Sequence, residues 1–302
     1  MTWFTRQGVA PLMLSQTYLP DTSPRATIVV AICLVRDAVG NHVAAMLHSL
    51  RAAGYRTLLM VEHSDPRQTE EVRRSTMAVR LADLKYPTPQ SQRAADHFFS
   101  SDVVIVVYPL YYELADLIKL ARHSAVIFDY HSVTPPELWG PEQPGYTNLI
   151  IGQQRVDLVQ YADYAIARSR FTGDELVRTG LIPPDRVVVT PLGSVTPSDP
   201  VRCEPDPSLV ARYKPHGERV LLYVGRMARN KRLIDLVEAL ALVRQQVPNT
   251  ILLLVGDNTF PLYRAYADEI LARAANWGAA SRSSSPVRCQ TWSRTTACAI
   301  CW

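Results

Sequence analysis

Short apolar runs rich in β-branched residues alternate with longer amphipathic stretches along most of this chain, beginning at Thr27. This alternation constrains the fold most, because it is typical of a parallel β-sheet whose strands are joined by crossover helices. The expected strands of a first domain are Ile28–Leu34, Thr57–Glu62, Asp102–Val107, Ala125–Phe128, Tyr164–Ala167 and Val187–Thr190. The expected helices between them are His42–Ala53, Arg67–Leu81, Tyr112–Arg122, Leu149–Tyr161 and Thr172–Thr179. We therefore predict an α/β fold that starts with one doubly wound domain.

A second unit with the same pattern starts at Arg219. The segment Pro191–Pro215 precedes it, and because this segment is rich in proline and lacks apolar periodicity we predict an extended crossing between domains. The expected elements of the second unit are strand Val220–Val224, helix Lys231–Val247, strand Ile251–Val255 and helix Pro261–Trp277. Five apolar residues of its first helix are predicted to share one face: Leu233, Leu236, Val237, Leu240 and Val243. This unit is the beginning of another Rossmann-like domain.

After Gly278 the pattern stops, and residues 279–302 contain no predicted strand or helix. Two strand–helix pairs would leave an unpaired sheet edge, so we expect the rest of the second domain to be missing. One hypothesis is a shifted reading frame, because Val287–Thr296 can be re-read as Gly-Gln-Val-Pro-Asp-Leu-Glu-Pro-Tyr-Tyr if Arg288 is encoded by AGG. Sequencing the encoding DNA tests it. The expected division is an N-terminal extension (1–26), a first domain (27–192), a linker (193–218), a partial second domain (219–278) and an aberrant tail (279–302).

Composition excludes several classes of protein. With 47% hydrophobic and 20% charged residues, the chain is globular in composition. Its apolar runs are short: Val103–Val107 and Ile251–Val255 have five residues and Ile28–Val35 has eight, whereas a membrane helix needs roughly twenty. The first residues lack the basic and apolar regions of a secretory signal. We therefore expect a cytoplasmic protein. Because the basic residues are scattered and the net charge is only +4, we do not expect it to bind nucleic acid.

The segment Leu221–Lys231 places a glycine and two cations where a strand ends. Gly225 follows the strand, and its lack of a Cβ lets a ligand approach the backbone. Arg226 and Lys231 then flank the start of the next helix, whose free N–H groups and partial positive charge suit a diphosphate. The same spacing also fits a solvated arginine and lysine on an ordinary loop, with Asn230 capping the helix.

Further candidates lie at strand ends in the first domain. His131 follows a strand and would lie at its carboxyl end, the edge where ligands bind in open α/β sheets, although a lone histidine is more often structural. Gly40 and Asn41 follow the first strand and equally fit a turn and an N-cap. The aromatic residues of Tyr108–Tyr112 fit packing better than a sugar-stacking wall.

Two classes of cofactor are disfavoured. No GxGxxG follows the first strand, which argues against a nicotinamide-dependent dehydrogenase. No His, Asp and Glu residues have ligand spacing, and the pair Cys298 and Cys301 cannot by itself complete a tetrahedral zinc site. We therefore predict a protein without metal or cofactor.

One motif begins with Tyr223-Val-Gly-Arg226, has Lys231 at the fifth position after Arg226, and continues with Leu-x-x-Leu-x-x-Ala-Leu. It resembles the donor-site signature of the GT-B glycosyltransferases of family 4, also called glycosyltransferase group 1. The resemblance extends from about Thr27 to Trp277. It implies that Arg226 and Lys231 hold the diphosphate of a nucleotide sugar, and fixed cations stabilise the departing nucleoside diphosphate without a metal. It also implies that residues 27–192 form the acceptor-side domain and residues 219–278 part of the donor-binding domain.

The same resemblance gives roles to residues elsewhere. The run Asp-Tyr-His-x-Val-Thr-Pro-Pro-Glu resembles the family segment whose histidine, here His131, faces the donor sugar across the interdomain cleft. Gly40 and Asn41 correspond to the glycine loop that approaches the donor phosphates and the acceptor, although Val39 replaces the first glycine of the usual pair. Gly256 follows the second strand of the donor domain, near the nucleoside or in a simple turn.

The implied activity is retaining transfer of a sugar from a nucleotide-diphosphate sugar to a glycan or lipid-linked acceptor. The family implies front-face transfer, in which the leaving phosphate helps deprotonate the acceptor hydroxyl. A lipid-linked acceptor implies peripheral contact with the inner membrane face, for which the sequence offers no basic amphipathic helix. Because the family's acidic E-x7-E region is absent, we expect weak nucleotide-sugar binding and little activity. The alternative is a non-catalytic binding or accessory protein that retains the acceptor-side domain.

Overall fold

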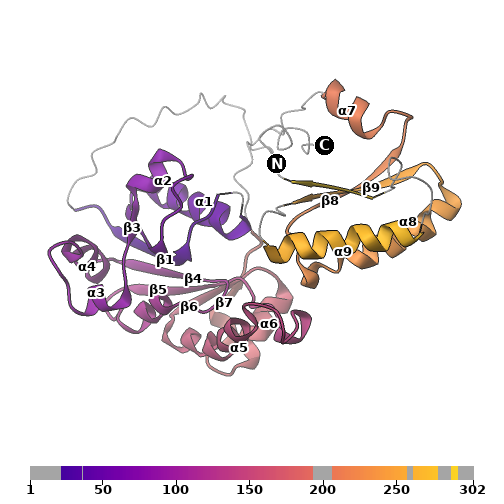
Figure 1. Cartoon of the computed structure of the whole chain (residues 1–302). Helices are drawn as coiled ribbons and strands as arrows, with labels where there is room; N and C mark the ends of the chain where they lie inside the picture. The colour runs from indigo at the N-terminus through magenta and orange to yellow at the C-terminus, as the bar shows by residue number, and fades with distance from the viewer. Residues whose placement is uncertain (1–21, 36, 193–205, 257–260, 278–286, 292–302) are drawn as a thin grey trace, which may run out of the picture. The chain divides into compact units, whose positions relative to one another are not determined.

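The two α/β patterns of the sequence correspond to two units in the computed structural model, which describes residues 22–35, 37–192, 206–256, 261–277 and 287–291 (Figure 1). Among these residues, unit 1 comprises those within 1–133 and 148–195, and unit 2 those within 134–147 and 196–302. Residues 134–147, which the sequence division places in the first domain, thus group with unit 2. The other limits of that division stay predictions, and most of the N-terminal extension lies outside the described residues.

Unit 1 contains a parallel sheet of seven strands in the order β3-β2-β1-β4-β5-β6-β7. The strands are β1 (Arg25–Ile32), β2 (Arg56–His63), β3 (Thr76–Ala78), β4 (Val103–Tyr108), β5 (Ala125–Tyr130), β6 (Tyr164–Ala167) and β7 (Val187–Val189). The six expected strands are confirmed, and the short edge strand β3 lies within the segment Arg67–Leu81, which was expected to be a helix. That prediction was wrong because the helix there, α2 (Glu70–Arg74), ends where the chain turns to pair with β2.

Helices cover both faces of this sheet (Figure 1). Helix α1 (Ala38–Ala52) and α2 pack on one face, where Val43, Leu47 and Val72 contact alternate residues of β1, β2 and β4. The other face is covered by α3 (Leu81–Lys85), α4 (Gln92–Phe99), the 3-10 helices η1 (Glu113–Lys119) and η3 (Arg155–Tyr161), and α6 (Arg170–Arg178). Because both faces are buried, the central strands read as continuous apolar runs rather than as alternating ones.

Two expected helices of unit 1 differ in type from the prediction. The segment expected as helix Leu149–Tyr161 is α5 (Tyr146–Gln154) followed by η3, and that expected as Tyr112–Arg122 is the 3-10 helix η1. Two further short 3-10 helices are η4 (Pro184–Arg186) in unit 1 and η2 (Pro136–Leu138), which groups with unit 2. Apolar spacing does not separate an α-helix from a short 3-10 helix, because side chains three residues apart lie close together in both.

Unit 2 contains a parallel sheet in the order β10-β9-β8. Its elements are α7 (Pro207–Tyr213), β8 (Arg219–Val224), η5 (Arg229–Lys231), α8 (Leu233–Gln246), β9 (Thr250–Gly256), α9 (Pro261–Trp277) and β10 (Val287–Thr291). Leu233, Val237 and Leu240 of α8 are buried in a core with α9 and β9, as the helical spacing predicts. Val243 is 38% exposed, so its place on the buried face was wrong.

Two local predictions for this half of the chain are corrected. Strand β10 lies in the tail that was expected to contain no strand, and it pairs in parallel with the edge of β9. Its sequence Val-Arg-Cys-Gln-Thr alternates apolar and polar residues, which is the period of a strand. Helix α7 lies in the segment expected to be an extended crossing, and Asp206 caps it by accepting a hydrogen bond from Ser208 N at 2.8 Å. Over the described residues, no helix is long and apolar enough to cross a bilayer.

Candidate functional site

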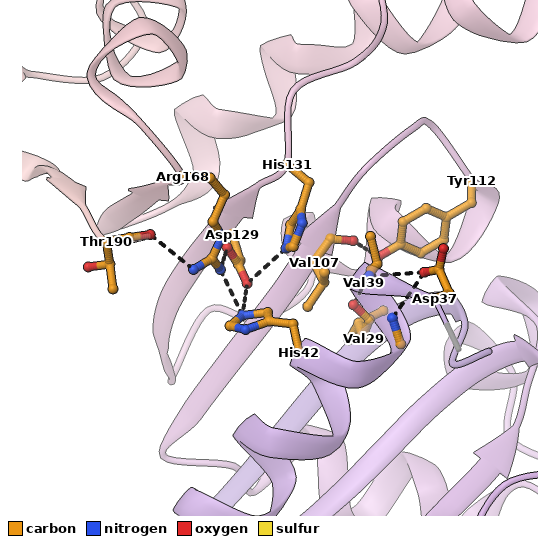
Figure 2. Close-up of polar contacts among 11 residues, drawn as sticks. Val29, Asp37, Val39, His42, Val107, Tyr112, Asp129, His131, Arg168 and Thr190 are labelled. Carbon is orange, nitrogen blue, oxygen red and sulfur yellow. Dashed lines mark hydrogen bonds and ion pairs between the residues drawn. The ribbon is translucent and has the colours of Figure 1, made fainter. Parts of the chain in front are cut away.

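Four polar side chains of unit 1 meet at the carboxyl edge of the seven-stranded sheet (Figure 2). His42 lies on α1, which follows β1, while Asp129 and His131 lie at the end of β5 and Arg168 directly after β6. The chain reverses its direction of winding between β1 and β4, and ligands of open α/β sheets bind outside the strand ends near such a reversal. We call these four residues the Asp129 cluster.

Asp129 is the centre of the cluster. Its Oδ2 lies 3.1 Å from His42 Nε2 and 3.5 Å from His131 Nε2, and its Oδ1 accepts a hydrogen bond from Arg168 Nη2. Arg168 Nη2 also lies 2.8 Å from His42 Nε2, and Arg168 Nη1 donates to the carbonyl oxygen of Thr190 at 3.3 Å. One carboxylate therefore holds two imidazoles and one guanidinium (Figure 2).

The cluster is buried and its carboxylate is charged. The side chain of Asp129 is fully buried, and those of His42, His131 and Arg168 are 13%, 4% and 9% exposed. Burial raises the pKa of the Asp129 carboxyl, but the His131 and His42 rings and the charge of Arg168 outweigh burial and hold this pKa well below its usual range. Asp129 is thus an ionised acceptor at neutral pH.

Three nitrogen atoms of the cluster are buried without a hydrogen-bond partner among the described residues: His42 Nδ1, His131 Nε2 and Arg168 Nε. His131 Nε2 is within ion-pair distance of Asp129 but does not have the geometry of a good hydrogen bond. Buried polar atoms of native proteins are usually paired, so unpaired ones mark a candidate functional site.

The fold brings together three groups that could ligate a metal, although their sequence spacing had suggested none. The potential ligand atoms of His42, Asp129 and His131 lie within 4.8 Å of one another. The guanidinium of Arg168, however, already donates to Asp129 and lies 2.8 Å from His42 Nε2, so it occupies the place where a cation would bind these groups. A metal would have to displace a paired positive charge, and these residues therefore do not fit a metal.

Gly40 and Asn41 lie inside α1, not in a loop before it. Asp37 is the N-cap, and its Oδ2 accepts hydrogen bonds from Val39 N at 3.0 Å and Gly40 N at 3.1 Å. A Cβ on Gly40 would lie 1.9 Å from the carbonyl oxygen of Leu34. Gly40 therefore allows α1 to pack against the backbone that follows β1, and the expectation that Asn41 could be the N-cap was wrong.

The aromatic residues after β4 are mainly structural. Tyr108 is fully buried and its hydroxyl donates to the carbonyl oxygen of Gly152 at 2.9 Å. The Tyr112 hydroxyl lies 2.9 Å from the carbonyl oxygens of both Val29 and Val107, so it bridges β1 and β4 (Figure 2). These contacts support packing as the role of Tyr108 and Tyr112.

The loop Gly225–Arg232 of unit 2, here called the cationic loop, carries four basic side chains, and all four are exposed. Arg229 pairs with Glu269 and Arg232 with Asp235, each at 2.6 Å. Arg226 and Lys231 have no acidic partner among the described residues. These two cations, which the sequence analysis singled out, are therefore the ones available to a ligand.

The start of the following helix differs from the prediction. Helix α8 begins at Leu233 rather than Lys231, because η5 and Arg232, whose φ is 51°, precede it. Asn230 does not cap the helix, and its buried Oδ1 has no partner among the described residues. No side chain caps α8, so the N–H groups of its first turn remain without a side-chain acceptor beside the cationic loop.

Gly225 follows β8 directly, Gly256 is the last residue of the neighbouring strand β9, and the two glycines lie against each other. Gly225 N donates to the carbonyl oxygen of Val255 at 2.9 Å, and a Cβ on Gly256 would lie 2.0 Å from the carbonyl oxygen of Gly225. The close approach of the two backbones thus explains why position 256 is glycine. That Gly256 lies near a nucleoside stays a prediction.

The sequence analysis identified His131 but missed His42, Asp129 and Arg168 as members of one cluster. A usable signal existed for Asp129, because residues two apart on a strand share a face and Asp129 precedes His131 by two. Arg168 also follows a strand directly. For His42 the sequence offered no signal, because its place depends on how α1 returns across the sheet.

Several solved structures are similar to this chain in fold. The chain is similar to HepE from Anabaena, determined in complex with UDP-glucose (17% identity, TM-score 0.60, 89% of this chain and 69% of that chain). It is also similar to a glycosyltransferase from Rickettsia africae (15% identity, TM-score 0.63, 90% of this chain and 69% of that chain). A third similar structure is trehalose 6-phosphate synthase from Burkholderia multivorans (13% identity, TM-score 0.56, 89% of this chain and 73% of that chain). These similarities confirm the predicted fold class, α/β with two Rossmann-like domains of the GT-B type.

Sequence comparison then places the chain in a family. Residues 39–196, just over half of the 302 residues, match the model of glycosyltransferase family 4. The chain therefore belongs to glycosyltransferase family 4. A search of curated protein sequences gave no match.

Proposed function

We propose that this protein is a retaining, metal-independent glycosyltransferase that transfers a sugar from a nucleotide-diphosphate sugar to a glycan or lipid-linked acceptor. The observation that carries the proposal is the difference among the four cations of the cationic loop. Arg229 and Arg232 are paired with carboxylates, whereas Arg226 and Lys231 are exposed and have no acidic partner among the described residues. A diphosphate would supply the missing anionic partner.

The chemistry of the departing group explains why cations are needed at this loop. Negative charge grows on the nucleoside diphosphate as the glycosidic bond breaks, and fixed positive charges stabilise this change without a metal. The uncapped N–H groups at the start of α8 add donors and a partial positive charge on the same side. Gly225 follows β8 directly and precedes Arg226, and the Tyr223 hydroxyl, which donates to the Arg226 carbonyl oxygen at 3.0 Å, fills the space that a Cβ on Gly225 would need.

The Asp129 cluster supports a mechanism without a protein base. Asp129 is fully buried and paired with Arg168, so its carboxylate does not act as a base or nucleophile toward a sugar. In front-face transfer the leaving phosphate takes the proton of the acceptor hydroxyl instead. We assign to His131 the contact with the donor sugar, and we keep a cytoplasmic location with peripheral contact at the inner membrane face as a prediction.

Ligand-observed NMR with UDP and UDP-glucose tests the proposal, and we chose these probes because HepE was solved with UDP-glucose. We expect weak binding of both to the full chain. Replacing Arg226 or Lys231 by alanine should weaken UDP binding about threefold to tenfold, since each removes one charge-assisted hydrogen bond.

The matched controls are Arg229→Ala and Arg232→Ala, because these residues lie in the same loop but are already paired with Glu269 and Asp235. They should leave UDP binding nearly unchanged. An equal loss in all four variants would mean that net charge alone attracts UDP. Complete absence of binding to the wild-type chain would contradict the proposal and favour a non-catalytic accessory protein.

A further inference from the structure

We infer that Asp129 and Arg168 are positioning residues that hold His131 in one tautomer, with the ring proton on Nε2. An ionised carboxylate only accepts hydrogen bonds. Asp129 Oδ2 lies 3.5 Å from His131 Nε2, which is ion-pair distance without good hydrogen-bond geometry. The negative charge of the buried carboxylate at this distance attracts an Nε2–H group and repels an Nε2 lone pair, so it favours the tautomer with the proton on Nε2. Nδ1 then keeps its lone pair and offers an acceptor, which suits the hydroxyl donor of a sugar.

Arg168 determines which oxygen of Asp129 the histidines share. Its Nη2 donates to Oδ1, and its Nη1 donates to the carbonyl oxygen of Thr190, which ties the guanidinium to the backbone after β7. Only Oδ2 is left for the two imidazoles. Because Asp129 is fully buried, water does not compete for that oxygen.

The position of the His131 ring is restricted as well. Its backbone N donates to the carbonyl oxygen of Tyr108 at 3.0 Å, which continues the β4–β5 ladder by one residue. The next residue, Ser132, has a left-handed φ of 60°, and its hydroxyl donates to Glu175 Oε2 of α6 at 3.0 Å. The ring of His42 lies 5.4 Å from that of His131 between centroids. In a ring held this way, the tautomer decides which nitrogen can accept a hydrogen bond.

An asparagine at position 129 would reverse the tautomer. Arg168 has only donors, so the amide oxygen of Asn would turn toward it. The amide NH2 would then face His131 Nε2, which would have to accept, and the proton would move to Nδ1. In serine proteases, replacing the aspartate of the catalytic triad by asparagine likewise leaves the histidine in the wrong tautomer.

Histidine ¹⁵N NMR of the full chain, recorded at a pH at which the spectra show neutral rings, measures the tautomer directly. Loss of signals in His131→Gln and His42→Gln assigns these two among the seven histidines. In the wild type we expect a protonated Nε2 for His131, and in Asp129→Asn a protonated Nδ1. In the double variant Asp129→Asn/Arg168→Met the amide is free to turn, and the proton should return to Nε2.

Asp116→Asn is the matched control, since Asp116 also pairs with an arginine, Arg155, at 2.6 Å but lies outside the cluster. It should leave the His131 signals unchanged. A wild-type His131 protonated on Nδ1 overturns the inference, and that measurement does not require any variant to fold. A folded Asp129→Asn variant, checked by circular dichroism, with an unchanged tautomer also overturns it.

The link to the sugar rests on the proposed function and has its own measurement. In Asp129→Asn, UDP should bind as in the wild type, whereas the additional affinity of UDP-glucose over UDP should fall about threefold to tenfold, the effect of one hydrogen bond. A merely structural role would weaken both ligands together. If the wild type binds neither ligand, the proposed function fails while the tautomer result still decides the inference.

Discussion

The Asp129 cluster and the cationic loop use charge in opposite ways. In the cluster a buried carboxylate is paired with Arg168 and two imidazoles, so its charges are compensated within the protein. In the loop Arg226 and Lys231 are exposed and have no acidic partner among the described residues. Buried charges must be paired for the protein to fold, whereas exposed ones need no partner. The cluster should therefore matter for stability and the loop for binding.

The largest effect is expected for Asp129→Ala. Arg168 would stay buried without its carboxylate, and breaking a buried pair in this way costs about 3–5 kcal/mol of unfolding free energy. Urea unfolding followed by circular dichroism measures this loss. Arg226→Ala is the control from the loop and should change the unfolding free energy by less than about 0.5 kcal/mol. Similar losses in both variants would remove the contrast between the two regions.

A somewhat smaller loss is expected for Gly40→Ala, which tests the backbone that supports His42. The new Cβ would lie 1.9 Å from the Leu34 carbonyl oxygen, so α1 has to shift, at a cost of about 2–3 kcal/mol. Gly173→Ala is the control within a helix, because its nearest neighbour is a Val189 methyl group at 3.3 Å. A thermal melt of the two variants compares them, and equal midpoints would show that the close contact at Gly40 is relieved without cost.

The pH dependence of the unfolding free energy should come from the buried carboxylates and not from the cationic loop. The pKa of Asp65 is lowered to about 2 by hydrogen bonds from Arg67, against the effect of burial, and the pKa of Asp129 is also depressed. A depressed pKa contributes stability above the unfolded value near 3.8, and this contribution is lost as pH falls.

We therefore expect the unfolding free energy to decrease as pH falls below about 5, with Asp65 and Asp129 both contributing to the loss. Asp129→Asn should flatten this dependence, and Lys231→Ala should not change it. Urea titrations at a series of pH values measure the slope. An unchanged slope in Asp129→Asn would contradict the assignment of Asp129 as an ionised, stabilised carboxylate.

The smallest effect is expected for Glu269→Ala. This change releases Arg229 from an exposed ion pair, which contributes less than about 1 kcal/mol to stability. The cationic loop would then have three unpaired cations, and UDP binding should strengthen about twofold. Ligand-observed NMR detects the change. Weaker UDP binding after Arg229 is freed would contradict the claim that unpaired cations of this loop bind the diphosphate.

Strand positions in unit 1 were predictable because both faces of the sheet are buried. Central strands were identified because a strand covered on two sides is apolar at every position, as in Val103–Tyr108. The edge strand β7, in which Val188 and Val189 are exposed, was identified from its run of β-branched valines instead. Edge and surface elements were less predictable. Strands β3 and β10 are short edge strands, and they have too few residues to show a clear strand pattern in the sequence. They form because they pair with β2 and β9.

The residues of the cationic loop could also be identified only in part from the sequence. Arg226 and Lys231 could be identified from sequence because they lie close together on one loop, and local spacing limits where they can be. The pairing of Arg229 with Glu269, 40 residues away, could not be identified, although it decides which cations are available. Asn230 likewise does not act as the predicted cap, because Arg232 with its left-handed backbone precedes α8.

The sequence by itself determined the α/β class, six of the seven strands of unit 1, the glycine and cations after β8, and the family resemblance, because all of these depend on residues close together along the chain. Only the tertiary structure decided that His42, Asp129, His131 and Arg168 form one cluster, since they come from three separate segments. Partners that far apart are brought together by strand order and helix packing, and no local pattern encodes their distances.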